Sequence, residues 1–199
     1  MAYRCIERRF DKMKIGFLCE GPTDEYFLKS SEFKKLLDSL EIILIGVRNL
    51  NGKGNLKTSR VLTQSRILFD EGAEKVFVLV DLDHDKCITK TKELIPEHDN
   101  QTIVVAVREV EAWLLADRQN MADFLEVDYE LEFPEKLSDP KNEMLELARS
   151  KFSPRILTET KVFYRIMDNG FSLRRAAQHP NCPSAAYFLN KLSVLNTQY

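Results

Sequence analysis

Four short apolar runs, each followed by polar residues, divide the first part of the chain. They occupy residues 13–19, 42–45, 76–80 and 102–107. Runs of this length that are rich in Val and Ile are typical of strands buried on both faces of a parallel sheet. The segments between the runs carry apolar residues at helical spacing, and they cover residues 23–40, 57–69 and 88–95. This alternation predicts an α/β fold with a mostly parallel central sheet of about four strands flanked by helices.

The pattern changes after a fourth helical segment at residues 108–117. From about residue 120 onward it becomes helical and irregular, and five prolines interrupt it. We therefore expect an α/β domain at residues 13–119 and a mainly helical C-terminal extension, residues 120–199, packed on it. Trp113 lies on the apolar stripe of the fourth segment and is expected in the core, where large aromatic side chains stabilise a fold. The alternative is an exposed anchor for a partner protein.

An acidic stretch, DLDHD at residues 81–85, follows the third apolar run directly. Asp81 and Asp83 are two residues apart, and at the end of a strand this spacing puts both carboxylates on the same side. Two carboxylates placed in this way repel each other unless a cation lies between them, and a divalent metal ion held by oxygen ligands is the usual solution. The alternative is a strand that ends in an ordinary polar turn.

Two further acids follow other apolar runs. Glu20 comes directly after the first run, and Glu111 lies beside the apolar face of the helical segment that follows the fourth run. The carboxyl ends of parallel strands meet at one edge of the sheet, which is the edge where open α/β sheets bind ligands. A carboxylate beside an apolar face is costly unless it is paired or bound. The sequence therefore predicts that these acids gather at the carboxyl edge.

Net charge and composition exclude few of the kinds of molecule that this protein could bind. The chain has 199 residues and a formal net charge of −2, which gives no global electrostatic case for nucleic acid or a membrane. Residues 140–199, however, carry nine basic and four acidic side chains, an excess that suits a phosphate-rich partner or a solvated face. The four cysteines lie far apart, which argues against a zinc site or a disulfide framework. With no apolar leader or membrane run in the sequence, we expect a cytoplasmic protein.

Several short motifs, in a fixed order, resemble those of known protein families. The sequence EGPTDE at residues 20–25 resembles the "EGxTE" motif of Toprim domains of the overcoming-lysogenisation-defect nuclease type. The DLD at residues 81–83 resembles the DxD motif of a later Toprim strand. REVEAWLLAD at residues 108–117 is similar to the signature of the Toprim-like domain-of-unknown-function family 4276. The C-terminal elements of that family match DPK at 139–141, Tyr164, NG at 169–170, CPS at 182–184 and FL at 188–189.

This resemblance, which covers most of the chain from residue 14 onward, implies a Toprim-like fold and Mg²⁺- or Mn²⁺-dependent phosphodiester chemistry. By motif position it implies Glu20 as the general acid or base and as a metal ligand. Asp81 and Asp83 would hold the metal ion and complete the catalytic set, and Asp85 and Glu111 are the candidates for a second ion. Relatives often lie beside ATPases in phage-defence or abortive-infection loci, which implies a role of that kind.

Basic side chains near these acids are candidates for binding substrate phosphates. They are Lys53, Lys57, Arg60 and Arg108. On this hypothesis the protein is a metal-dependent nuclease or a related phosphotransfer enzyme. One alternative is a non-catalytic or conditionally active partner subunit of an ATPase. Another is a phosphatase or nucleotide-binding receiver, but a receiver needs paired acids after its first strand, where this sequence has only Glu20.

Overall fold

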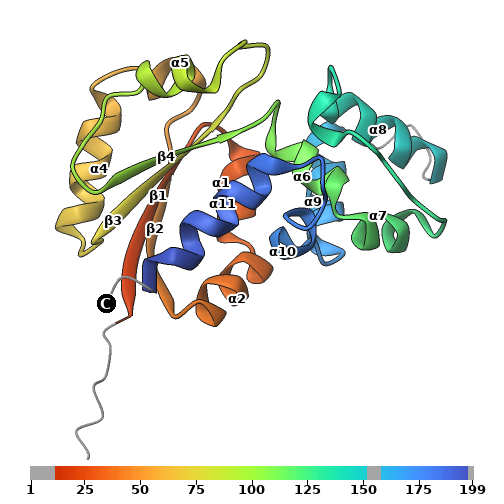
Figure 1. Cartoon of the computed structure of the whole chain (residues 1–199), viewed down its shortest axis with the longest axis horizontal. Helices are drawn as coiled ribbons and strands as arrows, with labels where there is room; N and C mark the ends of the chain where they lie inside the picture. The colour runs from red at the N-terminus through yellow and green to blue at the C-terminus, as the bar shows by residue number, and fades with distance from the viewer. Residues whose placement is uncertain (1–11, 152–157, 197–199) are drawn as a thin grey trace, which may run out of the picture.

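The computed structural model describes residues 12–151 and 158–196. At its centre lies a sheet of four parallel strands in the order β2-β1-β3-β4 (Figure 1). The strands are β1 (Met13–Cys19), β2 (Ile42–Asn49), β3 (Lys75–Asp81) and β4 (Gln101–Ala106). Each strand coincides with one of the four apolar runs. The predicted α/β class with a parallel four-stranded sheet is therefore confirmed.

Helices cover both faces of this sheet (Figure 1). One face is packed by α3 (Lys53–Leu56), α4 (Arg60–Asp70) and α5 (Ile88–Glu93). The other face is packed by α1 (Pro22–Lys29), α2 (Ser31–Ser39), α6 (Val110–Ala116) and α11 (Pro183–Ser193). In β3, Phe77 and Leu79 enter the second of these cores, and Val76, Val78 and Val80 enter the first. This alternation is the period of two that a strand buried on both faces requires.

The strand register brings three strand ends to one edge of the sheet. Leu18 in β1 pairs with Val78 in β3, and Asp81 at the end of β3 pairs with Ala106 in β4. Because all pairs are parallel, the residues that follow β1, β3 and β4 leave the sheet on the same side. The chain segments that begin at Glu20 and Leu82 are thus neighbours in space although they are far apart in the sequence.

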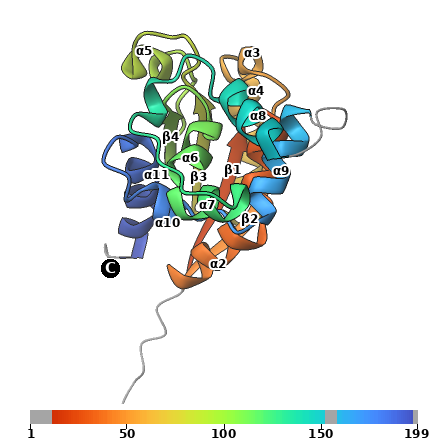
Figure 2. The same ribbon diagram turned by 90° about the vertical axis from the view of Figure 1, so that its right-hand side faces the viewer.

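The C-terminal part is helical and shares its core with the sheet. It contains α7 (Arg118–Leu125), α8 (Pro140–Lys151), α9 (Glu159–Asp168), α10 (Leu173–Ala176), α11 and the 3-10 turns Pro134–Lys136 and Val194–Asn196. Figure 2 shows α8 beside α9 and α6. Phe188 of α11 packs against Phe17, Phe77 and Trp113, with ring centroids 6.1, 6.3 and 5.6 Å away. The mainly helical character expected after residue 120 is confirmed.

Trp113 is buried completely and is not an exposed anchor. Its indole N–H donates to the Ser184 hydroxyl at 2.7 Å, and that hydroxyl donates to Glu135 at 2.5 Å. The Ser184 backbone N–H donates to the same Glu135 oxygen at 2.9 Å. A buried polar network of this kind is stable because its donors are satisfied. The expectation of a core tryptophan is confirmed, and the alternative of an interface anchor is wrong.

Three sequence expectations differ from the observed elements. The helix expected over residues 23–40 is two helices, because Ser30 has extended backbone (φ −60°, ψ 155°) and its hydroxyl caps α2 by accepting from the Phe33 N–H at 3.2 Å. The helix expected over 57–69 begins later, at Arg60, and the short α3 precedes it. β2 is mostly half-buried, because it lies at the edge of the sheet. An apolar run alone does not tell an edge strand from a central one.

Within the described residues, no helix has the length and apolar character that crossing a membrane requires.

Candidate active site

Glu20 follows β1 and is placed at the carboxyl edge by a backbone hydrogen bond: its carbonyl accepts from the Gly52 N–H at 2.8 Å. Its side chain is half-buried, and its Oε2 atom is buried without a hydrogen-bond partner. Burial, together with repulsion from Asp83 and Asp24, raises the pKa of Glu20 to about 7, although Lys53 opposes the shift. The structure therefore brings Glu20 close to the acidic stretch after β3, as predicted.

Asp24 is a member of this cluster that the sequence reasoning missed. It lies in the first turn of α1, where its Oδ2 accepts from the Gly21 N–H at 3.0 Å and caps the helix. Its Oδ1 is buried without a partner. Burial raises the pKa of Asp24 to about 6 against the lowering effect of the Gly21 N–H and Lys141. The available signal was the "EGxTE" motif, whose last acidic position falls on Asp24.

Asp81, the last residue of β3, is the most buried of the predicted metal ligands at the strand ends. It is 7% exposed, and its Oδ1 has no hydrogen-bond partner. Burial raises its pKa well above the usual range, and repulsion from Asp24, Glu111 and Glu20 adds to the shift. Asp81 therefore stands at the centre of a group of acids contributed by β1, α1, β3 and α6.

Asp83 and Asp85 lie in different surroundings from Asp81. Asp83 has a left-handed backbone (φ 51°), so the strand alternation stops at Asp81 and does not align the two carboxylates as the spacing had predicted. The Lys53 Nζ lies 2.8 Å from Asp83 Oδ2 and 3.0 Å from Asp85 Oδ2, and it donates to the Leu82 carbonyl at 3.1 Å. The carboxylates of Asp83 and Asp85 in this acidic loop are therefore already paired with a lysine of the same chain. Lys53, expected to bind phosphate, is this lysine.

Glu111 lies in the first turn of α6 and is almost completely buried. Its Oε2 has no hydrogen-bond partner, while its Oε1 lies 3.9 Å from the Nζ of Lys141. The same Nζ lies 2.5 Å from Glu109 Oε2. Burial raises the pKa of Glu111 to about 8, against the lowering effect of Lys141, and Glu109 repels it further. The cluster thus includes Glu111 together with Glu109, which no sequence motif marks as a site residue.

Lys141 comes from α8, outside the sheet, and sequence reasoning did not place it at the site. Burial lowers the pKa of its ammonium, but Glu111, Glu109 and Asp81 outweigh that effect and hold the pKa above its usual range. The ammonium therefore stays charged and serves as a resident cation among the carboxylates. The DPK motif at residues 139–141 had marked this segment, but local sequence does not show which distant acids a lysine will reach.

The other basic candidates lie at the margin of the cluster. Arg108 has a left-handed backbone (φ 63°), and its Nη1 donates to the Asp83 carbonyl at 3.2 Å and lies 3.3 Å from His84 Nδ1. Its guanidinium thus contacts the acidic loop. Lys57 and Arg60 are exposed, at the end of α3 and the start of α4. Lys57 lowers the pKa of Asp85 and so lies near the acidic loop, while Arg60 is three residues further along the chain.

The carboxylates of the cluster are side chains of the kind that binds a divalent cation, but they are not arranged as a ready-made metal site. Across residues 12–151 and 158–196, no three side chains of His, Cys, Asp or Glu are close enough together to hold an ion as they stand. Five buried carboxylate oxygens in the described residues nevertheless lack hydrogen-bond partners: Glu20 Oε2, Asp24 Oδ1, Asp81 Oδ1, Glu109 Oε2 and Glu111 Oε2. Of these, Glu109 Oε2 lies within ion-pair distance of Lys141. Unpaired buried carboxylates must take up protons or a cation. Oxygen ligands of this type are the ones that Mg²⁺ and Mn²⁺ prefer.

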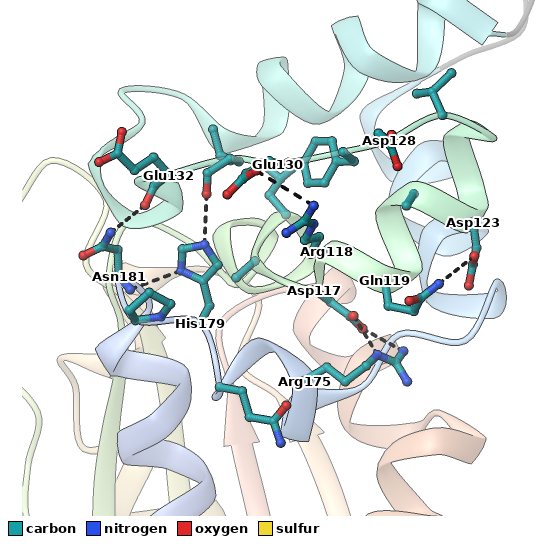
Figure 3. A pocket seen from close by; sticks show the side chains of 18 of the residues that line it. Asp117, Arg118, Gln119, Asp123, Asp128, Glu130, Glu132, Arg175, His179 and Asn181 are labelled. Atoms are coloured by element: carbon teal, nitrogen blue, oxygen red, sulfur yellow. Dashed lines mark hydrogen bonds and ion pairs between the residues drawn. The ribbon is translucent and has the colours of Figure 1, made fainter.

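A separate hollow of about 990 Å³ lies away from these carboxylates, between α7, residues 126–132 and residues 175–181 (Figure 3). None of the clustered acids lines it. One of its walls is fixed by Arg175, which forms two bonds of 2.7 and 2.8 Å to the carboxylate of Asp117. This pair joins α10 to Asp117, the residue between α6 and α7.

The fold and the cluster together define an α/β protein with an acid-rich site at the carboxyl edge of a parallel sheet. A protein-family model described as "Domain of unknown function (DUF4276)" matches residues 19–193, and the chain belongs to this family. The family resemblance seen in the motifs is thereby confirmed. Among solved structures, the C-terminal region of the Burkholderia pseudomallei OLD protein is similar at 16% identity and a TM-score of 0.36, covering 92% of this chain and 100% of that chain. No curated protein matches the chain.

Proposed function

We propose that this protein carries out divalent-metal-dependent phosphodiester hydrolysis of the nuclease type at the carboxylate cluster. The observation that supports the proposal is the set of buried, unpartnered oxygens on Glu20, Asp24 and Asp81. These three residues come from the ends of two strands and the first turn of α1, so the fold itself brings their charges together. A protein that buries repelling carboxylates at its ligand-binding edge gains from a bound cation, which compensates their repulsion.

In this proposal Glu20, Asp24 and Asp81 hold an Mg²⁺ or Mn²⁺ ion. When bound, the ion polarises a phosphoryl oxygen and lowers the pKa of water. Glu20 is the least buried of the three, so its carboxylate is the one open to solvent and able to accept a proton from water. Glu20 therefore takes the proton of the attacking water, and Asp81, which is buried more deeply, remains a ligand.

The proposed substrate approaches from the side of the acidic loop. Lys57 and Arg60 are exposed there and would neutralise phosphates flanking the scissile bond. Lys53 and Arg108 hold the loop in place through Asp83, so they act on substrate binding indirectly. The expected role in phage defence is part of the same proposal, and it is tested by comparing infection of cells carrying the wild-type chain or an Asp81→Asn variant.

The direct test is cleavage of labelled DNA, RNA and nucleotide substrates with Mn²⁺ or Mg²⁺. Asp81→Asn keeps the size of the side chain and is expected to reduce cleavage by about 100-fold or more, because it removes a charged group at the reaction centre. The matched control is Glu146→Gln, which makes the same kind of change in an exposed ion pair with Arg149 on α8. Equal cleavage by the wild type, Asp81→Asn and Glu146→Gln would overturn the proposal.

A further inference from the structure

The acids at the carboxyl edge form two groups that differ in their cation contacts. Glu109 and Glu111, at the start of α6, are reached by the Lys141 ammonium, at 2.5 Å from Glu109 Oε2 and 3.9 Å from Glu111 Oε1. Among the described residues, no lysine, arginine or histidine forms an ion pair with Glu20, Asp24 or Asp81. The Lys141 ammonium also lowers the pKa of Asp24 and of Asp81 from beyond ion-pair distance, but its ion-pair contacts are with Glu109 and Glu111.

The position of Lys141 restricts what else can bind at Glu109 and Glu111. A divalent ion bound to oxygen ligands sits about 2.0–2.6 Å from them, close to the place where the ammonium lies against Glu109. Such an ion would have to displace the ammonium and then lie beside it, with a repulsion that is severe in a poorly solvated site. Lys141 is about one-third exposed, and its ammonium is held in place by the 2.5 Å contact with Glu109.

We propose that the site binds a single divalent ion, at Glu20, Asp24 and Asp81, and that the ammonium of Lys141 takes the second cation position, at Glu109 and Glu111. This inference rests on the proposed function, because it assumes that the first group binds metal. It revises the expectation of a second ion at Glu111, and Asp85, the other candidate for that ion, is paired with Lys53. Positive charge from α8 then replaces a metal ion, so the helical C-terminal part completes the site.

The test counts Mn²⁺ ions bound to the full chain by isothermal titration calorimetry and by electron paramagnetic resonance. The wild type is expected to bind about one ion per chain, with the spectrum of an isolated Mn²⁺ ion. Lys141→Met keeps an unbranched apolar side chain, one atom shorter, but removes the charge, so it frees both glutamates. This variant is expected to bind about two ions with the spin coupling of a neighbouring pair. Lys141→Met/Glu111→Gln is expected to return to about one ion.

Two controls separate the effect from damage to the fold. Lys141→Arg keeps the positive charge, and we expect it to bind one ion like the wild type even if its stability changes. Lys35→Met removes the same charge from an exposed lysine that pairs with Glu32 at 2.6 Å, and it too should bind one ion. Circular dichroism of each variant confirms that it is folded.

The possible results distinguish this inference from the proposed function. Two coupled ions in the wild type would overturn the inference and leave the proposed function standing. One ion in both the wild type and folded Lys141→Met would also overturn it, because the freed glutamates would then have no affinity for metal. If no variant binds Mn²⁺ at millimolar concentration, the metal-dependent function itself is wrong and the inference falls with it.

Discussion

At the scale of single residues, the main feature of the site is a group of buried carboxylates that lack some of their hydrogen-bond partners. Asp24, Asp81 and Glu111 are all nearly inaccessible, and each has one oxygen that no hydrogen bond satisfies. Burial is the first cause of the raised pKa of each. Such an arrangement costs stability in the absence of a ligand, which is the behaviour expected of a binding or catalytic site.

Replacing Asp81 by Asn should change both the stability of the protein and its response to metal. Asp81→Asn removes a buried charge that Asp24, Glu111 and Glu20 repel, so the metal-free protein should become more stable at neutral pH, by on the order of 1 kcal/mol. The same variant should lose the stabilisation that Mn²⁺ gives the wild type. Urea unfolding with and without Mn²⁺ measures both effects. A destabilised Asp81→Asn that is still stabilised by Mn²⁺ would contradict the account.

The stability of the metal-free protein should depend on pH because two buried carboxyl groups have raised pKa values. In the folded protein the pKa values of Asp24 and Glu111 are raised, to about 6 and about 8, so the folded state binds more protons than the unfolded state. The free energy of unfolding of the metal-free protein should therefore fall as the pH rises through these values, from about 5 to about 8. Stabilisation by Mn²⁺ should be larger at pH 8 than at pH 5.5. Denaturation curves across this range check the sign, and a contribution that rises with pH would be inconsistent with it.

At the scale of elements, the strands could be predicted from the sequence and the site only in part. An apolar run of five to seven residues has few ways to be buried, so β1 and β3 follow from composition and length. Ser30 is a local signal for a helix break, but the surrounding apolar spacing continues across it and hides the boundary between α1 and α2. The edge position of β2 depends on strand order, which a single strand sequence does not contain.

The site residues that can be predicted from the sequence are those that strand topology alone positions. Glu20 follows β1 directly and Asp81 is the last residue of β3, and parallel topology alone brings them to one edge. Lys141 reaches that edge from α8, through packing between helices distant in the sequence, and no periodic pattern reports such a contact. The pairing of Lys53 with Asp83 and Asp85 likewise depends on how two loops meet.

An element-scale prediction follows from the break at Ser30. Ser30→Ala removes the hydroxyl that caps α2 and should cost about 1 kcal/mol of unfolding free energy. Mn²⁺ binding should be unchanged, because the cap does not contact the carboxylate cluster. Ser31→Ala, at the neighbouring exposed position, is the control and should be nearly neutral. Chemical denaturation with Mn²⁺ titration tests both, and equal stability of the two variants would mean that the cap contributes nothing.

At the scale of the whole molecule, the helical C-terminal part is tied to the sheet both by the core and by the site. Phe188 of α11 packs on Phe17 and Phe77, while Lys141 of α8 pairs with Glu109 at the carboxyl edge. One hydrophobic cluster extends from β1 to α11. The α/β part therefore depends on the C-terminal part to cover one of its faces and to balance its buried charge.

This dependence predicts the outcome of truncation. A chain that ends at residue 119 loses α8 and α11, so the aromatic face of the sheet becomes exposed and Glu109 and Glu111 lose Lys141. We expect such a fragment to lack cooperative unfolding and to bind the dye ANS strongly. Thermal unfolding followed by near-ultraviolet circular dichroism, with the full chain as control, measures this. A fragment that unfolds cooperatively would show that residues 13–119 are an independent domain.

Glu20, Asp24 and Asp81 are proposed to bind one divalent cation together, and anomalous diffraction can locate such an ion in a crystal. Crystals of the full chain soaked in Mn²⁺ should show a single anomalous peak within coordination distance of oxygens from all three residues. The peak should be absent in Asp81→Asn crystals treated in the same way. Density only at Asp83 and Asp85, or no density at saturating Mn²⁺, would contradict the account.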